Sequence, residues 1–149
     1  TLVRALASHR VVAYLRGGAY WNDLYRPDDP SRALALTAAI LERFVGTAAQ
    51  QGRRGLVLVF PTHADLLRRR AGAPWPYAPL LAELRQRGID ALDVGDALLA
   101  ATPEVELFVA NGQHFNEEGN RRVAAAVEAF LRARAVWPGE EAGPGGIGP

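Results

Sequence analysis

The strongest constraint on the fold is an unbroken apolar run, Gly-Leu-Val-Leu-Val-Phe, at residues 55–60. Gly52 before it is suited to end a helix, and Pro61 after it lacks the amide that a strand needs to continue. A short run without polar alternation is typical of a strand buried on both faces, as in parallel sheets covered by helices on each side. The run therefore predicts a parallel β-sheet with flanking helices.

Helix and strand signals alternate on both sides of this run. A long helix is predicted over residues 29–51, because Asp-Pro is a favourable helix start, and its Leu36, Ile40 and Phe44 lie on one face. The other expected elements are a helix over residues 2–15, a loop over 17–30, one or two helical turns over 64–70, a loop over 73–76, a helix over 79–87, a strand over 89–94, a short helix over 94–100, and a final helix over 117–135 whose positions 123, 127, 130 and 131 face the core. This alternation predicts an α/β layered domain with right-handed crossovers.

Length and composition fit one domain followed by a loose tail. A chain of 149 residues with 49% hydrophobic content can bury one real core. Thr1 is not an initiator methionine, the first residues read as the middle of a helix, and two clear strands make a thin sheet. We therefore expect residues 1–137 to be an α/β domain that is incomplete at its N-terminus, and the Gly/Pro-rich residues 138–149 to be a flexible tail.

The charged residues exclude several classes of function. All 17 basic residues are arginine and 16 acidic residues oppose them, so the net charge of +1 leaves no electrostatic footprint for nucleic acid. The arginine run at residues 68–70 is too short to change this and is typical of a solvated helix face. The absence of lysine excludes a phosphate-loop lysine, a Schiff base and a lysine general base within the chain.

The sequence also predicts no resident metal, no cofactor and no membrane segment. Without cysteine there is no disulfide and no thiolate ligand, and three scattered histidines make no metal-ligand spacing. No apolar run approaches the ~20 residues that span a bilayer. The sequence leaves the cellular compartment and the oligomeric state open.

The chemistry-bearing residues gather near the C-terminal end, in the stretch Asn-Gly-Gln-His-Phe-Asn-Glu-Glu-Gly-Asn at residues 111–120. Asn116 is suited to cap a helix, and Glu117 and Glu118 suit the positive end of its dipole. His114 is therefore expected on a loop that ends at a rigid helix, where catalytic groups are often found.

Three features follow predicted strands or lie beside the last helix: residues 61–63, residues 93–96 and the His114 loop. In open α/β sheets, the functional crevice lies at the carboxyl ends of the strands. We therefore expect these features to line one site.

The strand that ends at Pro61, the Gly-Ile-Asp-Ala-Leu-Asp segment at residues 88–93 and the His-Phe-Asn-Glu-Glu-Gly-Asn segment at 114–120 resemble the C-terminal half of the SGNH (GDSL-type) hydrolases. This family contains esterases and enzymes that transfer ester-linked acyl groups. The resemblance covers most of residues 31–135, and its specific part is confined to about residues 107–124.

The resemblance implies a fold, a reaction and a substrate class. The fold is a three-layer, flavodoxin-like parallel sheet with flanking helices, present here as its C-terminal portion. The reaction is that of a serine esterase or O-acyltransferase, with a small-molecule or carbohydrate ester as substrate and no cofactor. His114 matches the family's catalytic histidine, which takes the serine proton as general base and returns it to the leaving group as general acid.

The chain departs from the family pattern at the nucleophile. Its two serines, Ser8 and Ser31, stand in no Gly-Asp-Ser turn after a strand. The nucleophilic serine is therefore expected outside this chain, and the chain alone is expected to be inactive. The rival hypothesis is a non-catalytic α/β binding or scaffold domain in which the nucleophile has been lost.

A second departure is Asn111, which occupies the place of the family's aspartate three residues before His114. An asparagine can orient an imidazole through its carbonyl oxygen but adds no stabilising charge, and the same change costs about 10⁴ in turnover in a well-studied serine protease. A backbone carbonyl, Asp93 or Asp96 could orient the ring instead. Asn111 also reads as a turn former before Gly112.

Other residues admit two interpretations. His114 could merely form hydrogen bonds around a helix start. His63 could bind a metal with Asp65, although an exposed loop histidine is the simpler interpretation. Loop aromatics could form an acyl- or sugar-binding wall, although they most often cover a core edge: Trp21, Tyr25, Trp75 and Tyr77.

Overall fold

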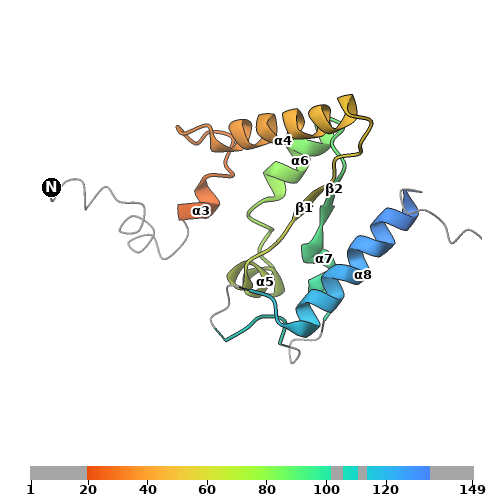
Figure 1. Cartoon of the computed structure of the whole chain (residues 1–149). Helices are drawn as coiled ribbons and strands as arrows, with labels where there is room; N and C mark the ends of the chain where they lie inside the picture. Colours follow the sequence, from red (N-terminus) through yellow and green to blue (C-terminus); the bar gives the residue numbers. More distant parts are fainter. Residues whose placement is uncertain (1–19, 102–105, 111–113, 135–149) are drawn as a thin grey trace, which may run out of the picture. The chain divides into compact units, whose positions relative to one another are not determined.

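The computed structural model describes residues 20–101, 106–110 and 114–134 (Figure 1). The predicted helix over residues 2–15, Ser8, Asn111 and the predicted tail at 138–149 lie outside these ranges. The described elements are α3 (Tyr20–Asp23), α4 (Ala33–Gln50), β1 (Val57–Val59), α5 (His63–Arg70), α6 (Ala78–Gln86), β2 (Ala91–Asp93), α7 (Val94–Leu99) and α8 (Glu117–Ala133). Helices and strands thus alternate as the sequence predicts.

The two strands form a small parallel sheet, which confirms the pairing expected from the apolar run. Val57 lies opposite Ala91, and Val59 lies opposite Asp93. Val57 and Val59 are buried, whereas Phe60, which extends the run, lies beyond the strand and is 45% exposed. The strand is therefore shorter than the apolar run that predicts it.

The described residues divide into two compact units. Residues 20–59 and 67–93 contain the sheet and are called the sheet unit. Residues 60–66, 94–101, 106–110 and 114–134 contain His114 and are called the histidine unit.

In the sheet unit, α6 packs against α4 and β2. Arg87, which follows α6, links the two helices. Its guanidinium nitrogens lie 2.6 Å from the Glu42 carboxylate of α4 and 2.6 Å from the Glu83 carboxylate of α6. Ion pairs that remain partly exposed to solvent stabilise a fold only slightly, so the apolar core carries most of the packing energy. That core is formed by Leu34, Ala38, Val57, Val59, Trp75, Tyr77, Leu80, Leu84 and Ile89.

The apolar face predicted on α4 is exposed. Leu36, Ile40 and Phe44 are 60%, 59% and 54% exposed, whereas the buried positions of the helix are Leu34 and Ala38. Helical spacing places residues on a common face, but it does not say which face meets a neighbour.

Two local features differ from the sequence prediction. Residues 20–23, expected in a loop, form the short helix α3. Helix α4 begins at Ala33, because the Ser31 hydroxyl donates to the Asp29 carboxylate and accepts the Ala33 amide at 3.2 Å. Arg32 then stands at the N-cap with a left-handed φ of 55°. Residues 29–32, which were expected to begin the helix, thus form a polar turn that precedes it.

In the histidine unit, α7 packs against α8. Its buried apolar residues are Leu66, Val94, Leu98, Ala101, Leu107 and Phe108. Positions 123, 127, 130 and 131 of α8 are half-buried, and Gly119 is the buried residue of that helix. Across the described part of the chain, no helix combines the length and the apolar character needed to cross a membrane.

Candidate functional site

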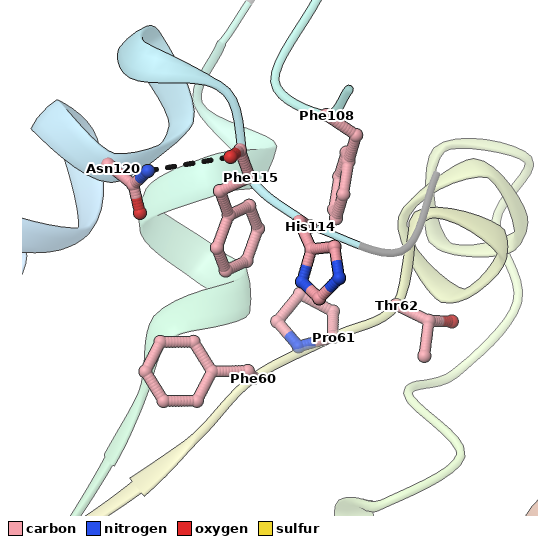
Figure 2. Close-up of a pocket in the computed structure, with 7 residues that line it drawn as sticks. All are labelled: Phe60, Pro61, Thr62, Phe108, His114, Phe115 and Asn120. Carbon is pink, nitrogen blue, oxygen red and sulfur yellow. Dashed lines mark hydrogen bonds between the residues drawn. The ribbon is translucent and has the colours of Figure 1, made fainter. Parts of the chain in front are cut away.

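A pocket of about 690 Å³ opens in the histidine unit (Figure 2). Residues from three segments line it: Phe60, Pro61, Thr62, Phe108, His114, Phe115 and Asn120. Figure 2 shows the His114 imidazole directed into the space between Phe115 and Thr62. The pocket thus brings together two of the three features expected to share a site, residues 61–62 and the His114 loop.

A short antiparallel pairing holds His114 in place. Phe108 and Phe115 form an isolated bridge, the Val109 amide donates to the His114 carbonyl oxygen at 2.9 Å, and the Asn116 amide donates to the Leu107 carbonyl oxygen at 3.0 Å. The backbone of His114 is therefore fixed on both sides, by Phe115 and Asn116 after it and by the partner segment opposite.

The start of α8 is fixed to the same pairing. The Asn116 side chain accepts the Gly119 amide at 2.9 Å and donates to the Glu106 carbonyl oxygen at 2.8 Å. The first of these bonds confirms Asn116 as the helix cap, since it satisfies an amide that has no partner within the helix. The loop and the helix therefore form one rigid support for His114.

Charge at the first turn of α8 is balanced within the helix. Arg121 and Arg122 donate to Glu118 at 2.7 Å and 2.6 Å. These hydrogen bonds, chiefly that from Arg121, lower the pKa of Glu118 to about 2. The carboxylate is thus engaged outside the pocket, which it does not line.

The His114 imidazole forms no hydrogen bond or ion pair with any residue that the structure describes. Asn111, expected to orient it, lies outside the described residues. Asp93 accepts the Tyr77 hydroxyl at 2.9 Å in the sheet unit, and Asp96 lies in the first turn of α7. Neither aspartate lines the pocket, so the third predicted feature does not join the other two there.

Thr62 and Asp65 form a reciprocal cap at the start of α5. The Thr62 amide and hydroxyl donate to the Asp65 carboxylate at 3.0 Å and 2.7 Å, and the Asp65 amide donates back to the hydroxyl at 3.2 Å. This cap explains why a carboxylate that is only 8% exposed is stable there.

His63, considered with Asp65 as a metal ligand, stacks instead on Phe108 at a ring distance of 5.1 Å. No group of three or more metal-ligating side chains occurs among the described residues. Trp75 and Tyr77 were two of the four aromatic residues considered as an acyl- or sugar-binding wall. Both are buried and stacked at a ring distance of 5.4 Å in the sheet unit, so these two belong to its core.

Two pocket residues, Phe60 and Phe108, were not expected at the site from the sequence, and Phe115 and Asn120 were included only as part of the stretch 111–120. A signal for two of them exists, because Phe108 and Phe115 flank the Asn-Gly turn dipeptide at 111–112, as expected for residues paired across a hairpin. Asn120 is placed by the start of α8, whereas Phe60 reaches the pocket through a contact with Phe115 that no local pattern encodes.

A small parallel sheet among helices, with a histidine on a loop before a capped helix, is an α/β arrangement that fits the SGNH hydrolase-like family. The chain belongs to this family: the family model described as "SGNH hydrolase-like domain, acetyltransferase AlgX" matches residues 20–144, most of its length. The resemblance to SGNH hydrolases is thereby confirmed. Among curated proteins and among solved structures, no significant match was found.

Proposed function

We propose that this chain is the histidine-bearing part of an SGNH-type enzyme that transfers an ester-linked acyl group to an alcohol or to water. The acyl transfer named in the family description favours an alcohol as acceptor, which makes the protein an O-acyltransferase with esterase activity as a side reaction. The observation that carries the proposal is the placement of His114 at an aromatic pocket, on a loop that a capped helix supports.

In this reaction His114 acts as general base. It takes the proton of a serine hydroxyl as the serine oxygen attacks the ester carbonyl, and it returns the proton to the departing alcohol. The acyl group stays on the serine. In the second half, the imidazole takes a proton from the acceptor alcohol or water, the acyl group moves to that oxygen, and the proton returns to serine.

The serine is proposed to come from outside these 149 residues. Ser31 is engaged in the cap of α4 in the sheet unit, and none of the described residues of the histidine unit is a serine. We further propose that residues 1–137 belong to one three-layer, flavodoxin-like domain, with 138–149 as a tail, and that Asn111 orients the His114 ring without adding charge.

The test is ester hydrolysis by the complete gene product with p-nitrophenyl acetate as substrate. Replacing His114 by Ala should lower kcat/KM about 10²- to 10⁴-fold, the usual contribution of a general base. His63→Gln is the matched control, because its ring stacks on Phe108 but is not among the residues that line the pocket, and it should retain most of the activity. The isolated 149-residue chain should be inactive. Equal activity of wild type and His114→Ala would refute the role of His114.

The rival function is a binding domain without catalysis, and the lack of a described serine in the histidine unit is the observation that favours it. The two functions differ in one readout. An enzyme turns over an aryl ester in the complete gene product, whereas a binding domain shows no His114-dependent turnover with any ester.

A further inference from the structure

The walls of the pocket are mainly aromatic. Phe108 and Phe115 have ring centroids 4.8 Å apart, and Phe115 and Phe60 have centroids 6.0 Å apart. Both distances lie in the range of favourable aromatic pairs, about 4.5–7 Å. These three rings, called the phenylalanine wall, run from buried Phe108 through half-buried Phe115 to Phe60, which is 45% exposed.

Among the described residues that line the pocket there is no acidic side chain and no arginine, although 33 of the chain's residues are charged, 17 basic and 16 acidic. Thr62 adds little polarity, because its hydroxyl is engaged in the cap with Asp65. The Asn120 amide donates to the Phe115 carbonyl oxygen at 3.4 Å. The polar atoms that remain for a ligand are therefore few, chiefly the His114 imidazole and the Asn120 carbonyl oxygen.

This distribution separates two kinds of acyl group. A hydrocarbon chain against the phenylalanine wall leaves water without losing a polar contact. A chain that ends in a carboxylate would lose hydration against these rings and find no arginine among the described lining residues. The pocket is open to solvent on one side, so the wall can be reached by an acyl chain without a change of the backbone.

We infer that the phenylalanine wall is an acyl subsite beside His114, and that it selects neutral, apolar acyl chains over carboxylated ones, with Phe60 as an exposed specificity residue. The inference rests on the proposed function, because His114 identifies the ligand as an ester. Figure 2 shows Phe60 and Phe115 on one side of the imidazole and Phe108 above it.

The test uses the 149-residue chain and two matched probes, methyl butyrate and monomethyl succinate, whose acyl chains have the same length and differ in charge. NMR titration of the His114 and Phe115 resonances gives a Kd for each probe. Methyl butyrate should bind at least about tenfold more tightly, because the succinate carboxylate is left unpaired in the pocket.

Phe60→Ala should weaken methyl butyrate binding about fivefold, the loss expected for one aromatic contact. Because Phe60 is already 45% exposed, this variant should fold. Phe44→Ala is the matched control, since Phe44 is 54% exposed on α4 of the sheet unit, and its Kd should equal that of wild type. Equal affinity for both probes, equal affinity of Phe60→Ala and wild type, or no binding by wild type would each overturn the inference.

The outcome is separable from that of the proposed function. Binding is measured here on a chain that lacks the nucleophile, whereas the role of His114 is measured as turnover of the complete gene product. Wall-dependent methyl butyrate binding together with full activity of His114→Ala would refute the general base and leave the acyl subsite standing.

Discussion

Gly119 lies so close to Leu107 that a β-carbon at position 119 would come within 2.2 Å of the Leu107 carbonyl oxygen. The same β-carbon would lie 3.0 Å from the Phe115 β-carbon. Leu107 and Phe115 both belong to the antiparallel pairing that carries His114. The glycine therefore lets the first turn of α8 rest directly on the support of the pocket.

Gly119→Ala should destabilise the histidine unit by about 1–3 kcal/mol, because the added methyl group forces the helix away from Leu107. Gly46→Ala is the control. Gly46 lies within α4 and has open space around its β-position, so alanine there should stabilise the helix by up to about 1 kcal/mol. Amide hydrogen exchange in α4 and α8 reports the two effects separately. A Gly119→Ala variant as stable as wild type would contradict the close approach.

Asn116→Ala should lower the free energy of unfolding of the histidine unit by about 1–2 kcal/mol, because the Gly119 amide and the Glu106 carbonyl oxygen both lose their partner. Asn116→Asp keeps the acceptor for Gly119 and loses the donor to Glu106, so it should fall between wild type and Asn116→Ala. Urea unfolding followed at α8 resonances measures the order. If Asn116→Asp and Asn116→Ala lower the free energy of unfolding equally, the hydrogen bond from the Gly119 amide is not the dominant contribution of Asn116 to stability.

Stability of α8 should depend on the ionisation of Glu118. Its folded pKa of about 2 lies below the ordinary value of 4.5, so the stabilisation is fully present above pH 4.5 and is lost as pH falls through about 2. The melting temperature of wild type should therefore exceed that of Glu118→Gln above pH 4.5, and the difference should disappear as the pH falls to about 2. The effect should be small and should weaken in high salt, because the pair is exposed. A constant difference from pH 5 to pH 2 would contradict the assignment.

The place of Asn111 can be tested by restoring a carboxylate. In the complete gene product, Asn111→Asp should raise kcat for p-nitrophenyl acetate at least about tenfold, since the reverse change costs about 10⁴ in a serine protease. Asn120→Asp is the control, because it adds the same charge at a residue that lines the pocket. An equal gain in both variants would show a general effect of charge and not a restored partner for His114.

Features with local signals were predictable from the sequence. Asn116 followed by two glutamates marks the start of α8, and the apolar run before Pro61 marks β1, because capping and burial of a short run depend on neighbouring residues. His114 was placed correctly before that helix for the same reason.

Features set by distant contacts were not predictable. The exposure of Phe44 depends on what covers α4, and the spacing of apolar residues does not contain that information. The grouping of Phe60 with Phe115 joins residues 55 positions apart in the sequence, 60 and 115, through the pairing of 107–109 with 114–116. The resemblance supplied the proposed role of His114, whereas the aromatic pocket around it emerged only from the fold.

The central claim is that His114 acts as a base, and chemical rescue tests it most directly. The complete gene product carrying His114→Ala should lose ester hydrolysis, and added imidazole should restore part of the lost rate in a saturable manner, because the emptied pocket can bind the free base. Imidazole should add nothing specific to His63→Gln. A His114→Ala variant that hydrolyses the ester at the wild-type rate, or that responds to imidazole no more than His63→Gln does, would contradict the account.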